Sequence, residues 1–159
     1  MSELSAAAAT PPGRGGVGIL RLSGTGAAEY DGKVFRPAGT IRMDRAPDRK
    51  LLYGELLDRE GRVVDSGLAF VSRAPRSYTG EDTAELQCHG SPVVLSLVLE
   101  ALLNAGARLA QPGEFTKRAI LNGKLDLTRS EAVIDLIDAE TPAAARQAAD
   151  QLSGALFRR

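Results

Sequence analysis

The chain changes character at Pro112, and this change restricts its fold more than any other feature. Before Pro112, short apolar runs alternate with turns that contain glycine or proline, which is typical of strands. After it, the strand patterns disappear and residues with helical spacing remain. The sequence therefore predicts a sheet-containing part followed by a helical part.

The first part contains strand patterns and one long helix. A polar turn, DREG at residues 58–61, separates two apolar runs and predicts a hairpin. Ser91 and Pro92 suit the N-cap and first position of a helix that runs to Leu103, and its wide apolar face predicts burial. Residues 73–82 form a predicted loop. The predicted strands are residues 17–22, 51–57, 63–71 and 83–88.

Helices are predicted throughout the second part. The first covers residues 114–121 and ends at Asn122, before a glycine that tolerates a left-handed backbone. Residues 128–131 (TRSE) match a capping box and predict the start of the second. The third covers residues 142–159, and its last turns carry an uncovered apolar stripe that predicts a truncated chain. This stripe consists of Leu152, Leu156 and Phe157.

Composition excludes several classes of protein. A length of 159 residues suits one domain, or one domain with a short helical extension. The 20 basic residues balance 20 acidic ones, which argues against a broad basic surface for nucleic acid. The lone Cys88 fits a reducing compartment, and neither a membrane span nor a signal peptide is recognisable. We therefore expect a cytoplasmic protein outside the membrane.

The familiar catalytic and cofactor motifs do not fit. Residues 13–18 (GRGGVG) have the letters of a dinucleotide fingerprint, but they precede a predicted strand, whereas that fingerprint opens a helix. No phosphate-binding loop of the form GxxxxGK[ST] is present. One histidine, His89, beside one cysteine cannot assemble a closed zinc site, and no nucleophile with an orienting partner is recognisable. We expect neither a metal site nor catalytic residues.

Three charged residues stand in surroundings that predict partial burial. Arg21 and Glu85 lie within predicted strands, and Lys124 lies in the turn between two predicted helices. Each residue is equally compatible with a solvent-exposed position at the edge of the fold, because most charged side chains are exposed.

Five sequence blocks, in this order, resemble the N-terminal region of the MnmE (TrmE) family of bacterial tRNA modification GTPases. The resemblance runs from about Thr10 to the end of the chain and is weakest over residues 27–49. The blocks are residues 10–24 (TPPGRGGVGILRLSG), 77–82 (SYTGED), 85–90 (ELQCHG), 112–119 (PGEFTKRA) and 122–127 (NGKLDL).

The resemblance implies an α+β fold, with a mixed sheet and flanking helices like those of the folate-binding part of aminomethyltransferases. It implies a folate-binding and dimerisation domain over residues 1–118 and the first helices of a truncated helical domain over residues 119–159. It also implies a homodimer that works with tRNA and the FAD protein MnmG at C5 of the wobble uridine. Potassium and magnesium would belong to a GTPase domain outside these residues.

The resemblance also assigns candidate cofactor-binding residues, namely Arg21, Glu85 and Lys124. The cofactor would be 5-formyl- or 5,10-methylene-tetrahydrofolate. A carboxylate can accept the adjacent N–H donors of a pterin, which suits Glu85, and the two cations suit the carbonyl and carboxylate oxygens of the ligand.

Two departures from the family pattern leave alternatives open. Ser91 replaces a second glycine after the histidine, and residues 5–9 offer alanines where the family has a β-branched strand. One alternative is a self-contained aminomethyltransferase-like folate enzyme. The other is a dimerisation module without a ligand.

Overall fold

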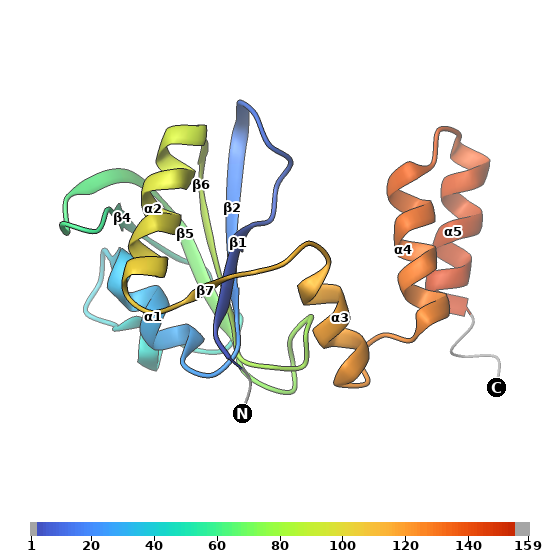
Figure 1. Ribbon diagram of the computed structural model, residues 1–159, viewed down its shortest axis with the longest axis horizontal. Coiled ribbons are helices and arrows are strands. Elements are labelled where there is room, and N and C mark those ends of the chain that lie inside the picture. Colours follow the sequence, from blue (N-terminus) through green and yellow to red (C-terminus); the bar gives the residue numbers. More distant parts are fainter. Residues whose placement is uncertain (1–2, 155–159) are drawn as a thin grey trace.

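A seven-stranded mixed sheet forms the body of the molecule (Figure 1). The computed structural model describes residues 3–154. The strand order is β3-β4-β5-β6-β2-β1-β7, and every neighbouring pair is antiparallel except the parallel pair of β1 and β7. The strands are β1 (Ser5–Ala8), β2 (Gly15–Ser23), β3 (Phe35–Pro37), β4 (Leu52–Leu57), β5 (Val63–Ser72), β6 (Thr83–Gly90) and β7 (Arg108–Leu109).

Two helices, α1 and α2, pack on one face of this sheet, and α4 and α5 form an antiparallel pair to one side of it (Figure 1). Helix α3 connects the two regions along the chain. No helix among the described residues is long and apolar enough to cross a membrane. The helices are α1 (Ala27–Val34), α2 (Pro92–Asn104), α3 (Glu114–Leu121), α4 (Leu127–Asp138) and α5 (Pro142–Gly154), with a 3-10 turn η1 at Met43–Arg45.

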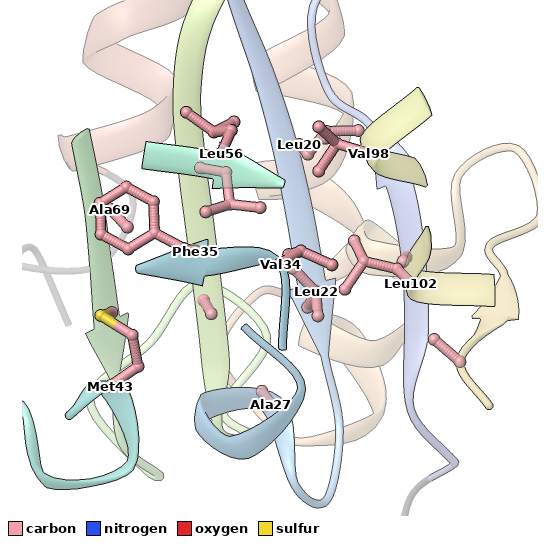
Figure 2. Close-up of a cluster of buried hydrophobic side chains, with 14 of the residues drawn as sticks. Leu20, Leu22, Ala27, Val34, Phe35, Met43, Leu56, Ala69, Val98 and Leu102 are labelled. Atoms are coloured by element: carbon pink, nitrogen blue, oxygen red, sulfur yellow. The ribbon is translucent and has the colours of Figure 1, made fainter. Parts of the chain in front are cut away.

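The core lies between the sheet and the pair α1 and α2. Leu20 and Leu22 of β2 face Val98 and Leu102 of α2, and all four side chains are fully buried (Figure 2). Arg21 stands between the two leucines in the strand and is only half-buried. Because successive side chains of a strand point to opposite faces, Arg21 points to the face that α1 and α2 leave uncovered.

The structure confirms the predicted α+β fold, in which a mixed sheet with flanking helices is followed by further helices. The predicted hairpin forms between β4 and β5, with Gly61 in its turn at φ +78°. The predicted cap of α2 is present, because Ser91 Oγ accepts a hydrogen bond from the backbone N–H of Val94 at 3.4 Å. Asn122 ends α3 as predicted, and the next residue, Gly123, has φ +73°.

The predicted capping box at residues 128–131 is wrong. Helix α4 begins at Leu127, and its N-cap is Asp126, whose carboxylate accepts the backbone N–H of Arg129 at 2.7 Å. Aspartate and threonine are both good N-caps, and Asp126 comes first along the chain with extended backbone. The helix therefore starts earlier than the sequence pattern indicated.

Two other predictions concern the ends of helices α3 and α5. The proposed domain boundary after residue 118 falls inside α3, and it stays a prediction. Of the predicted apolar stripe, only Leu152 is described, and it is half-buried. Leu156 and Phe157 lie outside the described residues.

Strand β1 forms although residues 5–9 are mostly alanine. It pairs with β2 on one side and with β7 on the other, so both edges of its backbone are hydrogen-bonded. Ser5 and Ala6 are buried. The two neighbours compensate for the low strand propensity of alanine.

Candidate functional site

Arg21 and Glu85 are direct cross-strand partners on β2 and β6. Nε of Arg21 donates a hydrogen bond to Oε1 of Glu85 at 2.9 Å, and Nη2 lies 2.9 Å from the same oxygen. The side chains are 26% and 17% exposed, so the pair is partly desolvated and still open to a ligand. Among the described residues, Oε2 of Glu85 has no hydrogen-bond partner.

Two aromatic rings flank the guanidinium of Arg21. Its Cζ lies 5.2 Å from the ring centroid of Tyr78, in the loop of residues 73–82, and 5.6 Å from that of Phe115, on α3. Both distances suit a cation–π contact. The Tyr78 hydroxyl lies 3.0 Å from Oγ1 of Thr116, so the loop and α3 also contact each other directly.

A pocket of about 370 Å³ opens beside these rings. Its walls come from β1, from Arg21, from the loop residue Tyr78 and from the start of α3, and small side chains leave room for a flat group. The lining residues are Ala7, Ala8, Ala9, Arg21, Tyr78, Ala110, Gln111, Pro112, Gly113, Phe115 and Thr116.

Lys124 lies next to this site but does not contact the charged pair. Its backbone N–H donates to the carbonyl oxygen of Ala119 at 2.8 Å in the turn after α3. Its side-chain methylenes approach Gly80, where an added Cβ would lie only 3.0 Å from Lys124 Cγ. Gly80 also has φ +80°, so glycine is favoured there on two grounds. The structure therefore joins Arg21 with Glu85 and places Lys124 on the adjoining loop.

An ionic cluster fixes α3 against the sheet. Nη1 of Arg118 donates to Oε2 of Glu81 at 2.9 Å and to the carbonyl oxygen of Ser23 at 3.0 Å. Nη2 of Arg118 lies 2.6 Å from Oε2 of Glu114. We call Ser23, Glu81, Glu114 and Arg118 the Arg118 cluster.

Hydrogen bonds hold the carboxylate of Glu114 in its ionised form. Arg108 donates two of them, at 2.9 and 2.7 Å, and these lower the pKa of Glu114 to about 2 despite the opposing effect of burial. The same bonds raise the pKa of Arg108. Glu114 is therefore charged throughout the neutral range.

The surroundings of His89 and Cys88 indicate structural roles for both residues. Nδ1 of His89 lies 2.9 Å from Oδ1 of Asp65, whose other oxygen accepts the His89 backbone N–H at 2.9 Å. Burial raises the pKa of Asp65, but the bonds from His89 and Ser66 outweigh it and leave the pKa lowered. Burial also raises the pKa of the Cys88 thiol to about 11, so this thiol is a poor nucleophile at neutral pH.

A larger cavity lies elsewhere. It measures about 570 Å³, is formed by α1, β3 and η1, and contains none of the three sequence-predicted site residues. Within the part of the chain that the structure describes, no group of three or more histidine, cysteine or acidic side chains is placed to bind a metal ion.

Sequence reasoning missed the aromatic rings and the Arg118 cluster. Tyr78, Glu81, Phe115 and Arg118 stand in two of the blocks that carried the family resemblance, at residues 77–82 and 112–119. Those blocks were the available signal, but nothing in their spacing assigns a role to a particular side chain.

Fold and site together define an α+β domain in which the sheet face opposite α1 and α2 carries a charged pair whose arginine lies near two aromatic rings. A family model described as "GTP-binding protein TrmE N-terminus" matches residues 5–124. The chain belongs to this family.

Relatives of the chain carry the name "tRNA modification GTPase MnmE". The protein from Carboxydothermus hydrogenoformans is 50% identical over 98% of this chain and 34% of its own length. The protein from Thermus thermophilus is 51% identical over 96% of this chain and 35% of its own length. The chain therefore spans about a third of the length of the curated relatives it matches.

Proposed function

We propose that this chain is the tetrahydrofolate-binding and homodimer-forming domain of a tRNA modification GTPase. The observation that carries the proposal is the Arg21–Glu85 pair, whose arginine lines a pocket together with Tyr78 and Phe115. Membership of the TrmE N-terminal family supports the same assignment.

The free oxygen of Glu85 suits the pterin edge of a folate. Oε2 can accept a hydrogen bond from one N–H of the ligand. Oε1 already accepts a hydrogen bond from Arg21 and would also accept one from a second N–H of the ligand. Hydrogen bonds to a charged acceptor are the stronger ones, so Glu85 is the proposed reader of the pterin. The ligand would be 5-formyl- or 5,10-methylene-tetrahydrofolate, which supplies a one-carbon unit when bound.

The cations would hold the oxygens of the ligand. Arg21 presents a planar guanidinium near two rings, and a guanidinium suits a carbonyl or carboxylate acceptor. Lys124 is exposed in the turn after α3, where its flexible side chain would donate a hydrogen bond to a second oxygen of the ligand.

The names of the relatives support a part in tRNA modification and a GTPase as the intact protein, and the rest of the wider assignment follows from the family resemblance. Residues 1–118 would form the folate-binding and dimerisation domain, and residues 119–159 would begin a helical domain. The intact protein would act in the cytoplasm, with tRNA and a FAD-containing MnmG-type partner, at C5 of the wobble uridine. GTP hydrolysis, potassium and magnesium would belong to sequence outside these residues, which contain no phosphate-binding loop.

Calorimetric titration with 5-formyltetrahydrofolate tests the proposal. We expect saturable binding with one site per chain, and much weaker binding of p-aminobenzoylglutamate, which lacks the pterin. If neither calorimetry nor equilibrium dialysis detects binding, the dimerisation module without a ligand is the better description. Turnover of folate with an amine donor would instead favour the aminomethyltransferase-like enzyme.

We also predict a homodimer at micromolar concentration. The uncovered sheet face continues beyond Glu85 through half-buried Phe70 and Leu68 to Tyr53, which is 60% exposed. The net charge of zero adds little repulsion between copies. Light scattering should report twice the 16.8 kDa mass of the chain, with Tyr53→Glu shifting it toward the monomer. A monomer across the micromolar range would contradict dimerisation.

A further inference from the structure

Arg118 lies where three separate parts of the chain meet. It bonds to Ser23 at the end of β2, to Glu81 at the end of the loop of residues 73–82, and to Glu114 within its own helix α3. The side chains of Arg118, Glu81 and Glu114 are only 11%, 14% and 10% exposed. These charges are therefore largely withdrawn from water and depend on one another.

The same three parts carry the groups around the proposed ligand site. Strand β2 carries Arg21, the loop carries Tyr78, and α3 carries Phe115. The rings of Tyr78 and Phe115 lie against Arg21 only while the loop and α3 keep their places on β2. The Arg118 cluster contacts none of these three side chains directly, so its influence on them passes through the backbone.

The loop contains no helix or strand, so hydrogen bonds to its neighbours hold it in place. Its buried residue Thr79 lies 2.7 Å from Oγ of Ser23, and that hydroxyl also donates to Oε2 of Glu81 at 2.8 Å. Asn122 donates to the carbonyl oxygen of Thr79 at 2.9 Å, which ties the turn before Lys124 to the same loop. One connected set of bonds thus runs from β2 through the loop to the end of α3.

We propose that Arg118 is a positioning residue for the folate site, acting through Tyr78 and Phe115 to fix the guanidinium of Arg21. This inference rests on the proposed function. A planar guanidinium can meet the acceptors of three elements at once, whereas a lysine ammonium is a compact point charge on a flexible stem. Arg118→Lys therefore keeps the charge of the cluster and loses its geometry.

A double-mutant cycle separates positioning from general stability. We expect Arg118→Lys to weaken binding of 5-formyltetrahydrofolate about tenfold in the otherwise unchanged chain, but less than about twofold in an Arg21→Lys background, because coupled residues are not additive. Equal losses in both backgrounds would overturn the proposal. Arg36→Lys is the control, because Arg36 also pairs with a glutamate, Glu55, but belongs to neither the Arg118 cluster nor the lining of the pocket. The affinity of this control variant for 5-formyltetrahydrofolate should be unchanged.

A second readout does not depend on folate. The Nε–H signal of Arg21 in a nitrogen–proton correlation spectrum reports the nearby rings and the bond to Glu85. Arg118→Lys should move this signal, and Arg36→Lys should leave it in place. If Arg118→Lys does not fold, Glu81→Gln removes one charge of the cluster and should also move the Arg21 signal from its position in the unchanged chain. An unmoved Arg21 signal would overturn the positioning role even if folate binds, whereas a moved signal without folate binding would count against the proposed function alone.

Discussion

We expect Glu85→Ala to lower the affinity of the chain for 5-formyltetrahydrofolate by at least tenfold while the chain remains folded. Hydrogen bonds to a charged group contribute about 1.5–3 kcal/mol, which corresponds to roughly tenfold or more in affinity. The substitution also leaves Arg21 without its ion-pair partner at a site where that guanidinium is 26% exposed. Calorimetry gives the affinity, and circular dichroism shows that the variant is folded.

The chain offers a matched control on the same sheet. Glu55 of β4 pairs with Arg36 of β3 as a direct cross-strand partner, just as Glu85 pairs with Arg21. Its side chain is 48% exposed, and its partner Arg36, unlike Arg21, does not line the aromatic pocket. Glu55→Ala should leave folate affinity unchanged. Unchanged affinity in folded Glu85→Ala would remove Glu85 from the proposed site.

Local patterns predicted the regular elements well. The hairpin of β4 and β5, the cap of α2 at Ser91 and the end of α3 at Asn122 all depend on residues within a few positions of one another. Where two local signals competed, the prediction failed, as at Asp126 and the capping box that follows it. Strands β3 and β7 were not predicted, because three and two residues are too few for a recognisable period.

The site was harder to predict, because its parts come together only through long-range pairing. Arg21 and Glu85 are 64 residues apart, and only the register of β2 on β6 makes them neighbours. Arg118 reaches Ser23 across 95 residues. Resemblance to a family could nominate Arg21, Glu85 and Lys124 one by one, but it could not supply the rings or the cluster that surround them.

A buried acid, Asp31, stands out among the charged residues that the structure describes. It occupies the core-facing side of α1 with Ala27 and Val34, and its side chain is fully buried. Neither carboxylate oxygen has a hydrogen-bond partner within the described residues, and burial raises the pKa of Asp31 well above its usual range. A group of this kind opposes folding once the medium can ionise it.

We therefore expect Asp31→Ala to stabilise the chain at pH 7.5 by about 1–3 kcal/mol, the usual cost of a buried polar group without a partner. Below the unfolded-state pKa of about 3.9, Asp31 is protonated in both states and its ionisation costs nothing. As the pH rises, the unfolded chain releases the proton while the folded chain retains it, so the stability of the unchanged protein falls until the raised folded-state pKa is reached. The advantage of the variant should accordingly grow from pH 4.5 to pH 7.5.

Urea denaturation of both proteins at these two pH values measures the difference. Asp135→Ala, on an exposed position of α4, is the control for replacing an aspartate by a better helix former, and it should change stability by no more than about 0.5 kcal/mol at either pH. A stability difference between Asp31→Ala and the unchanged chain that stays constant with pH would show that the carboxyl does not titrate differently on folding. A less stable Asp31→Ala would show that the side chain makes a favourable contact in the core.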